Sequence, residues 1–246
     1  MRQFGLIGYP LSHSFSKKFF TEKFENEGLR DCSYENYSIA SIDELPGLIK
    51  NNPLLQGINV TIPYKEQVLR FLTEQSDMVS EIKACNCIKI ENGVLRGHNT
   101  DVTGFEQSLR RGLTSHHQQA LILGTGGAAK AVACVLLKLG IRYRYVSRKP
   151  DAGGLRYTDI TPELLASHTL IINTTPLGMY PNTTECPPLP YQFLGSGHYL
   201  FDLVYNPSRT LFLQKGEERG AVIKNGHDML VIQAEESWKI WNKATV

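Results

Sequence analysis

One stretch of the chain, "ALILGTGGAAKAVACVLLKLG" at residues 120–140, restricts the possible folds more than any other part of the sequence. An apolar run typical of a buried strand leads into Gly124, Gly126 and Ala129, which fit the pattern G-x-G-x-x-A, and an apolar helical segment follows. The glycines permit a tight turn and the close approach of a pyrophosphate, whose charge is met by exposed N–H groups and by the helix dipole. Because a second strand is expected at residues 143–146, the stretch predicts a βαβ unit that binds a dinucleotide. A purely structural glycine turn is the alternative.

The end of that second strand indicates which dinucleotide binds. NAD sites usually place Asp or Glu there to bind the ribose 2′-hydroxyl, whereas this chain has Ser147, Arg148 and Lys149, with no acid until Asp151. A carboxylate would repel a 2′-phosphate, but a guanidinium can bind it bidentately. The sequence therefore favours NADP over a solvated basic turn.

Strand and helix patterns alternate along the whole chain, and that order predicts the α/β class. The alternation lapses at residues 113–119, which are polar and aperiodic, so a domain junction is expected inside or near a predicted helix at residues 103–111. The expected domains are an α/β domain at residues 1–102, completed by a terminal helix within residues 226–246, and a Rossmann-like domain at residues 103–225. The elements expected near the start are strands at residues 4–7 and 33–37 and a helix at about residues 17–27.

The stretch "GINVTIPYKE" at residues 57–66 begins like a buried strand but also carries polar groups. Its apolar and polar residues alternate, with Ile58, Val60 and Ile62 against Asn59 and Thr61. On the two-residue period of a strand, the apolar set is expected to face a core and the polar pair to share the other face. Pro63 is expected to end the strand, and Lys65 to lie in the first turn of a helix through Leu72. The pattern thus places an ammonium at the carboxyl end of a strand, where open α/β sheets bind ligands.

Composition narrows the classes of function. Hydrophobic residues make up 41% and charged residues 20%, which is ordinary for a globular enzyme and excludes a disordered chain. A formal net charge of +2 gives no electrostatic footprint for nucleic acid. The densest basic stretch, "RYRYVSRK", is predicted to be a strand, because the apolar residues around Arg142 and Arg144 alternate with them.

Five cysteines are an odd number, with no CxxC pair and no His partner at metal spacing, so neither a disulfide framework nor a zinc site is expected. A reducing compartment fits this usage best. The first residues have too short an apolar run for a signal peptide, and no stretch approaches the length of a transmembrane helix. We therefore expect a cytoplasmic protein that binds no membrane, nucleic acid or metal and is a monomer or a homodimer.

Seven motifs, in order, resemble those of the NADP-dependent shikimate dehydrogenase family, whose members reduce 3-dehydroshikimate to shikimate. The resemblance runs nearly end to end, through "GYPLSHSFS", "GINVTIPYKE", "ACNCI", "GHNTD", "GTGGAAKA", "NTTPLGM" and "NGHDMLVIQA". It implies two domains: a substrate domain completed by the C-terminal helix and a Rossmann-like NADP domain, with the ligands in a cleft between them.

The resemblance also implies roles for individual residues. Lys65 and Asp101 are the expected catalytic pair, and Asn59 is expected to support their loop. The expected substrate ligands are Ser14 and Ser16 for the carboxylate, Thr61, Asn86, Asp101 and Gln233 for the ring hydroxyls, and Tyr205 to close the pocket. The expected cofactor ligands are Gly124, Gly126, Gly127, Ala128, Ser147, Arg148, Lys149, Thr174, Gly226 and Met229.

Several of these residues also have a structural interpretation. Ser16 is a plausible N-cap for a helix that begins at Lys17, and Asp101 for the helix at residues 103–111. Lys65 could be a solvated lysine, and Asn86 and Gln233 ordinary surface groups. The chain departs from the family pattern at three positions, where Lys17 replaces a common Pro, Cys87 a Thr and Val102 a Gly.

The resemblance predicts a reaction in which NADPH supplies hydride to the ring ketone. A protonated Lys65 would stabilise the developing alkoxide and deliver its proton, alone or through Asp101. The alternatives are an NAD-dependent quinate/shikimate dehydrogenase, which the basic residues after the second strand disfavour, and a non-catalytic sensor of a shikimate-like acid.

Overall fold

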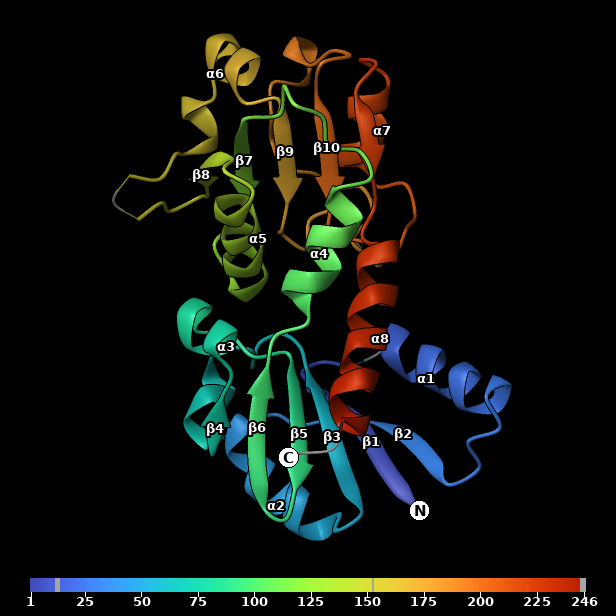
Figure 1. The fold of residues 1–246 in the computed structure, drawn as a ribbon. Coiled ribbons are helices and arrows are strands. Elements are labelled where there is room, and N and C mark those ends of the chain that lie inside the picture. The colour runs from blue at the N-terminus through green and yellow to red at the C-terminus, as the bar shows by residue number, and fades with distance from the viewer. Residues whose placement is uncertain (12–13, 152, 244–246) are drawn as a thin grey trace. The chain divides into compact units, whose positions relative to one another are not determined.

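The structure, a computed structural model, describes residues 1–11, 14–151 and 153–243, so two residues of the motif "GYPLSHSFS" lie outside the described part (Figure 1). The chain divides into two compact units, Met1–Thr103 with Leu230–Val246 and Gly104–Met229. Each unit contains its own sheet with helices, which confirms the predicted α/β class. Helices α4 (Asp101–Leu109) and α8 (His227–Asn242) contain the points at which the chain passes from one unit to the other.

The first unit contains a six-stranded sheet. Its strands are β1 (Arg2–Gly8), β2 (Cys32–Ser38), β3 (Leu55–Val60), β4 (Glu74–Gln75), β5 (Cys87–Glu91) and β6 (Val94–His98), in the spatial order β2-β1-β3-β5-β6-β4. β1 pairs in parallel with β2 and β3, while β5 runs antiparallel between β3 and β6. The carboxyl ends of β1, β3 and β6 therefore lie at the same edge as the amino end of β5. This edge collects the polar residues that the sequence places just after, or just before, those strands.

The two faces of this sheet are covered by different apolar clusters. Its helices are α1 (Phe15–Asn26), α2 (Leu45–Asn51), α3 (Asp77–Ile82), α8 and the 3-10 helices Ile42–Glu44 and Gln67–Phe71. On one face, Phe20 of α1 and Trp241 of α8 pack against Phe4 of β1. On the other, Ile58 and Val60 join the cluster that contains Leu45 of α2. Asn59, between them in β3, thus shares the face that α8 covers, as the alternation predicted.

The end of β3 differs from the prediction. Ile62 is 64% exposed and does not join the core, because the strand ends at Val60. The Tyr64 N–H donates to the Thr61 carbonyl, 2.9 Å away, and this turn directs Ile62 to the surface. The predicted helix from Lys65 to Leu72 is also wrong: a turn at residues 62–66 leads into the short 3-10 helix.

The second unit contains a parallel five-stranded sheet in the order β11-β10-β9-β7-β8. Its strands are β7 (Gln119–Leu123), β8 (Arg142–Val146), β9 (Leu170–Asn173), β10 (Tyr199–Asp202) and β11 (Val222–Lys224). Its helices are α4, α5 (Gly127–Lys138), α6 (Pro162–Ser167), α7 (Leu211–Glu217) and the 3-10 helices Tyr157–Asp159 and Tyr191–Phe193. The predicted strand, glycine turn, helix and strand are therefore β7, α5 and β8, and the basic stretch is a strand as expected.

Among the described residues, none of the helices has both the length and the apolar character needed to cross a membrane. All five cysteines lie in the described part of the chain and none forms a disulfide, and Cys85 and Cys87 are buried.

Candidate active site

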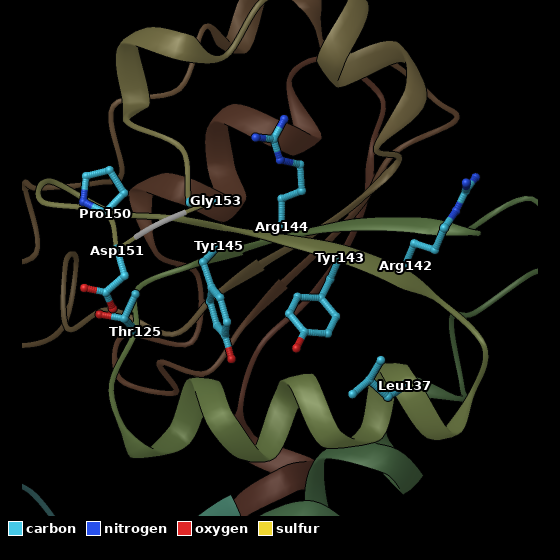
Figure 2. Close-up of a pocket in the computed structure, with 10 residues that line it drawn as sticks. Thr125, Leu137, Arg142, Tyr143, Arg144, Tyr145, Pro150, Asp151 and Gly153 are labelled. Atoms are coloured by element: carbon cyan, nitrogen blue, oxygen red, sulfur yellow. The ribbon is translucent and has the colours of Figure 1, made fainter.

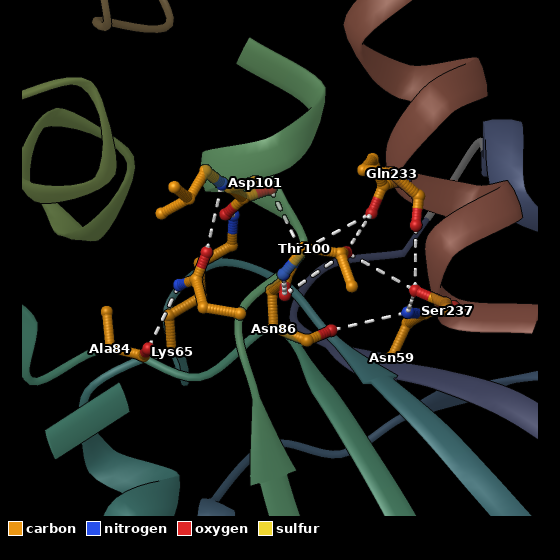
Figure 3. A network of polar contacts seen from close by, with 10 residues as sticks. Asn59, Lys65, Ala84, Asn86, Thr100, Asp101, Gln233 and Ser237 are labelled. Carbon is orange, nitrogen blue, oxygen red and sulfur yellow. Dashed lines mark hydrogen bonds and ion pairs between the residues drawn. The ribbon is translucent and has the colours of Figure 1, made fainter. Parts of the chain in front are cut away.

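The closest contact at the polar edge of the first sheet joins Lys65 and Asp101. Lys65 Nζ lies 2.6 Å from Asp101 Oδ2, and their side chains are 18% and 7% exposed (Figure 3). Lys65 follows β3, and Asp101 follows β6, which runs parallel to β3, so the sheet topology itself brings the two groups together. A largely buried pair of this kind keeps an ammonium in place without leaving its charge uncompensated.

Asn86 joins this pair to the terminal helix. It precedes β5, and its side-chain amide donates to Asp101 Oδ1 at 2.9 Å, to Thr100 Oγ1 at 3.0 Å and to Gln233 Oε1 at 3.3 Å. Its Oδ1 accepts the Thr100 N–H at 2.7 Å. Lys65, Asp101, Asn86 and Gln233, four of the predicted site residues, therefore form one network, in which Asn86 is 3% and Gln233 7% exposed. The interpretation of Asn86 and Gln233 as ordinary surface groups is wrong.

Asn59 also belongs to this network. Its amide donates to Ser237 Oγ at 2.9 Å and to the Asn86 carbonyl at 3.3 Å, and its Oδ1 accepts the Tyr34 hydroxyl at 2.8 Å. Tyr34, Thr100 and Ser237 were not among the predicted site residues. Thr100 lies inside the motif "GHNTD", and Ser237 follows Gln233 by one helical turn, so spacing could have indicated both. Tyr34 carries no such signal, because only the fold brings it to Asn59.

The two serines near the start of α1 have different local roles. Ser14 is the N-cap, with its Oγ accepting the Lys17 N–H at 3.2 Å, so the prediction that Ser16 caps this helix is wrong. The helix begins two residues earlier than expected, and this places Ser16 in its first turn. Ser16 lies beside the Tyr34 hydroxyl, whose pKa burial raises well above its ordinary value while the Ser16 hydroxyl lowers it.

Asp101 is not an N-cap either. It is the first residue of α4, and Asn99 Oδ1 accepts the Val102 N–H at 3.2 Å in the capping role. The Asp101 carboxylate interacts favourably with the dipole of α4, because it lies in the first turn of that helix. Thr61 directly follows β3, and its N–H donates to the Ile7 carbonyl at 3.0 Å, which holds it at the same edge.

The three departures from the family pattern occupy ordered surroundings. Lys17 Nζ pairs with Glu35 at 2.6 Å, and Val102 is buried. Cys87 is fully buried, and burial raises the pKa of its thiol while the neighbouring Ser237 hydroxyl lowers it. Burial likewise raises the pKa of Cys85 to about 12. Both thiols therefore stay neutral and bring no negative charge near Lys65.

The glycine turn of the second unit fits the pyrophosphate of a dinucleotide. Gly124 has φ +106°, and a Cβ added there would lie 2.7 Å from Thr174 Oγ1, so the turn accepts only glycine. Gly126 is the N-cap of α5 and, as a glycine, has no side chain that could accept a capping hydrogen bond. The N–H groups of its first turn, which begins with Gly127 and Ala128, thus form a helix terminus suited to an anion.

The residues after β8 fit the ribose end of NADP. Ser147 Oγ is buried and makes no hydrogen bond within the described part of the chain, so it leaves a polar group for a ligand. Arg148 and Lys149 are exposed. Asp151 and Thr125 line a neighbouring cavity of about 500 Å³. Tyr143 and Tyr145 also line this cavity, and their side chains point from β8 toward α5 (Figure 2). The ten described residues that line this cavity include none of the predicted cofactor ligands.

The remaining predicted residues also lie in the second unit. Thr174 Oγ1 donates to the Leu123 carbonyl at 2.7 Å, which fixes it beside the glycine turn. Gly226 packs against the backbone of Leu203, since an added Cβ would lie 2.2 Å from that carbonyl oxygen. Met229 is buried in α8, and Tyr205 is half-buried after β10.

This chain is similar to known proteins along nearly its whole length. The family model of the shikimate dehydrogenase substrate binding domain matches residues 6–88. A shikimate dehydrogenase (NADP(+)) of Caldicellulosiruptor saccharolyticus is 34% identical over 98% of this chain and 92% of its own length. The shikimate dehydrogenase 1 of Peptoclostridium difficile is 34% identical, with a TM-score of 0.85 over 100% of this chain and 93% of its own. The shikimate 5-dehydrogenase of Thermus thermophilus, solved in complex with NADP(H) and shikimate, is 31% identical, with a TM-score of 0.86 over 98% of this chain and 94% of its own.

Proposed function

We infer the reaction from a plain premise: this chain belongs to the shikimate dehydrogenase family. It is an NADP-dependent oxidoreductase that catalyses the reversible reduction of 3-dehydroshikimate to shikimate, a step toward chorismate and the aromatic amino acids. The observation that supports this most directly is the buried pair of Lys65 and Asp101, bonded through Asn86 to Gln233. These residues provide a cation that can bind a reacting oxygen and amide groups that can bind the hydroxyls of a polyol ring.

Lys65 and Asp101 are the proposed catalytic pair. Bound NADPH supplies a hydride to the ring ketone. The Lys65 ammonium donates a hydrogen bond to the carbonyl oxygen and stabilises the negative charge that develops there. Lys65 then transfers its proton to that oxygen, and Asp101, 2.6 Å from Nζ, holds the ammonium in position and takes part in its reprotonation. Because the charge develops only during the reaction, this interaction lowers the barrier more than it tightens binding.

The proposed substrate ligands hold the rest of the molecule. The hydroxyls of Ser14 and Ser16 bind the carboxylate, and Thr61, Asn86, Asp101 and Gln233 bind the ring hydroxyls. Tyr205 completes the pocket. Gln233 and Asn86 bond to each other at 3.3 Å, and substrate hydroxyls would replace part of this mutual bonding.

The second unit is the proposed NADP-binding domain. The glycine turn and the first N–H groups of α5 bind the pyrophosphate. Ser147, Arg148 and Lys149 bind the 2′-phosphate of the adenosine, while Thr174, Gly226 and Met229 line the rest of the cofactor site. We also propose that the enzyme works in the cytoplasm, which is supported by five cysteines that form no disulfide, and that it is a monomer or a homodimer.

The decisive experiment is an assay of NADPH oxidation with 3-dehydroshikimate, run beside NADH and beside quinate oxidation. We expect turnover of 3-dehydroshikimate with NADPH as the preferred cofactor. A preference for NADH and quinate would instead support the quinate/shikimate dehydrogenase. Binding of shikimate without turnover would support a sensor.

A further inference from the structure

The polar network of the first unit continues into the core as a relay of three buried side chains, Tyr34, Asn59 and Ser237. They are 3%, 3% and 0% exposed. Tyr34 lies on β2, Asn59 on β3 and Ser237 on α8, so the relay ties two strands to the terminal helix. Burying three polar side chains is costly unless their hydrogen bonds are satisfied. Hydrogen bonds satisfy these three groups and also join them to Gln233 and Asn86 of the site.

We propose that Tyr34 and Ser237 are positioning residues of the reductase, which fix the orientation of the substrate-binding groups through Asn59 and Gln233. This inference rests on the proposed function, because it names residues that serve the same site. Neither side chain needs to touch the substrate.

The hydrogen bonds of Asn59 leave it one orientation. Its carbonyl oxygen accepts from the Tyr34 hydroxyl at 2.8 Å, and its two amide protons go to Ser237 Oγ at 2.9 Å and to the Asn86 carbonyl at 3.3 Å. A flipped amide would set the Asn59 nitrogen against Tyr34 and its oxygen against the Asn86 carbonyl. The relay thereby holds the backbone of Asn86, whose side chain contacts both Asp101 and Gln233.

Ser237 fixes the helical side of the site. Its single proton goes to the Gln233 carbonyl at 2.9 Å, one turn earlier on the same face of α8, and its oxygen accepts from Asn59. Thr100 Oγ1 lies 3.3 Å from the same oxygen. One hydroxyl thus links Gln233 of α8 to Asn59 of β3 and to Thr100 next to Asp101. At the other end, Tyr34 lies beside Ser16, so the relay reaches from the proposed carboxylate ligands to the catalytic pair.

The chain also supplies matched controls. Ser108 and Tyr199, both in the second unit, are 0% and 1% exposed, and the hydroxyl of each makes no hydrogen bond within the described residues. Ser108→Ala and Tyr199→Phe therefore remove a buried hydroxyl that positions nothing. Ser237→Ala and Tyr34→Phe remove one that does.

The experiment measures kcat, the KM for shikimate, the KM for NADP and the melting temperature of these four variants and the wild type. We expect Ser237→Ala and Tyr34→Phe to raise the shikimate KM roughly three- to tenfold, the range for loss of one hydrogen bond, with the NADP KM within about twofold of wild type. The effect on kcat should be smaller than the effect on KM, because Lys65 keeps its contact with Asp101. The two controls should match the wild type in every kinetic constant.

Several outcomes would overturn the proposal. One is a shikimate KM within about twofold of wild type in both relay variants, and another is an equal rise in the controls. A lower melting temperature without a change in KM would give the relay a purely structural role. If Ser237→Ala does not fold, Tyr34→Phe carries the test alone, since it removes a single oxygen atom. A wild type without dehydrogenase activity would instead contradict the proposed function.

Discussion

Lys65 and Asp101 show how the fold determines the surroundings of a single charged side chain. A lysine after a strand is usually solvated, yet here its side chain is 18% exposed and lies 2.6 Å from a carboxylate. The residue types alone do not require this contact, since 36 positions separate the two along the chain. The parallel direction of β3 and β6 brings them to one edge, and the antiparallel β5 between them contributes Asn86.

The first prediction concerns Lys65→Ala. The substitution should lower kcat severely while changing the shikimate KM little, because the ammonium acts mainly on charge that develops in the transition state. Steady-state kinetics with shikimate and NADP give both constants. Turnover like that of the wild type would remove Lys65 from the mechanism.

The second prediction separates two functions of the neighbouring serines. Ser16→Ala should raise the shikimate KM about tenfold to a hundredfold, the loss expected for a hydrogen bond to a charged group, and leave the melting temperature nearly unchanged. Ser14→Ala should raise KM and also lower stability by about 1 kcal/mol, because Ser14 Oγ caps α1. Thermal unfolding beside kinetics distinguishes these effects. Unchanged KM in both variants would mean that neither hydroxyl binds the carboxylate.

The third prediction concerns cofactor choice and Arg148. Arg148→Ala should weaken NADP about tenfold to a hundredfold and hardly affect NAD, which lacks the 2′-phosphate. Lys149 retains part of the attraction as a point charge, so the double variant should lose more. The measurement is kcat/KM for both cofactors. A fall by the same factor for both would show that Arg148 does not bind the phosphate.

At the scale of elements, sequence periodicity predicted the strands β1, β2, β3, β7 and β8 and the helices α1, α4, α5 and α8, while the remaining strands and helices were not predicted. It failed after β3, where a short turn and a 3-10 helix replace an α-helix: such turns depend on local hydrogen bonds, here from Tyr64 N–H to the Thr61 carbonyl, more than on periodicity. For the candidate site, the sequence motifs predicted Lys65, Asp101, Asn86 and Gln233 as site residues. Periodicity could not indicate Tyr34 as a site residue. It also could not reveal the hydrogen bond from Asn59 to Ser237, because the two residues are 178 positions apart along the chain.

The fourth prediction tests the packing of β3 against α8. A Cβ at Gly57 would lie 2.4 Å from Trp241 Nε1, which is bonded to the Ile88 carbonyl at 3.0 Å and cannot move freely. Gly57→Ala should therefore destabilise the protein by about 1–3 kcal/mol, the usual range for overpacking. Gly47→Ala is the matched control, because nothing lies within 4 Å of its added Cβ in α2, and it should stabilise by about 0.5–1 kcal/mol. Chemical denaturation measures both, and equal stability of the two variants would contradict this account of the packing.

At the scale of the whole molecule, stability depends on pH through one buried carboxyl in particular. Asp202 ends β10 and is fully buried, and it accepts hydrogen bonds from Thr210, Asn173 and the Val204 N–H. Burial raises its pKa to about 7, and the three donors offset this only in part. Asn173 in turn accepts from the N–H and the hydroxyl of Thr175, so this carboxyl supports the loop that carries Thr174.

The fifth prediction follows from the sign of that shift. Because the folded-state pKa of Asp202 lies above its unfolded value, the folded protein binds an extra proton between about pH 4 and pH 7. The contribution of Asp202 to the free energy of unfolding is therefore largest below this window, falls as pH rises through it and levels off above it. Across the whole window the fall is on the order of 4 kcal/mol.

Asp202→Asn keeps the size of the side chain and cannot ionise, so it should remove this component. Relative to the variant, the melting temperature of the wild type should fall between about pH 4.5 and pH 7.5. Asp228→Asn is the control, since Lys224 lowers the pKa of Asp228 below its ordinary value of 3.8, so that its contribution stays constant across this range and is lost only at lower pH. Thermal unfolding of the three proteins across this range decides the matter: if the difference between wild type and Asp202→Asn stays constant, Asp202 is ionised in the folded protein and its three hydrogen bonds outweigh its burial.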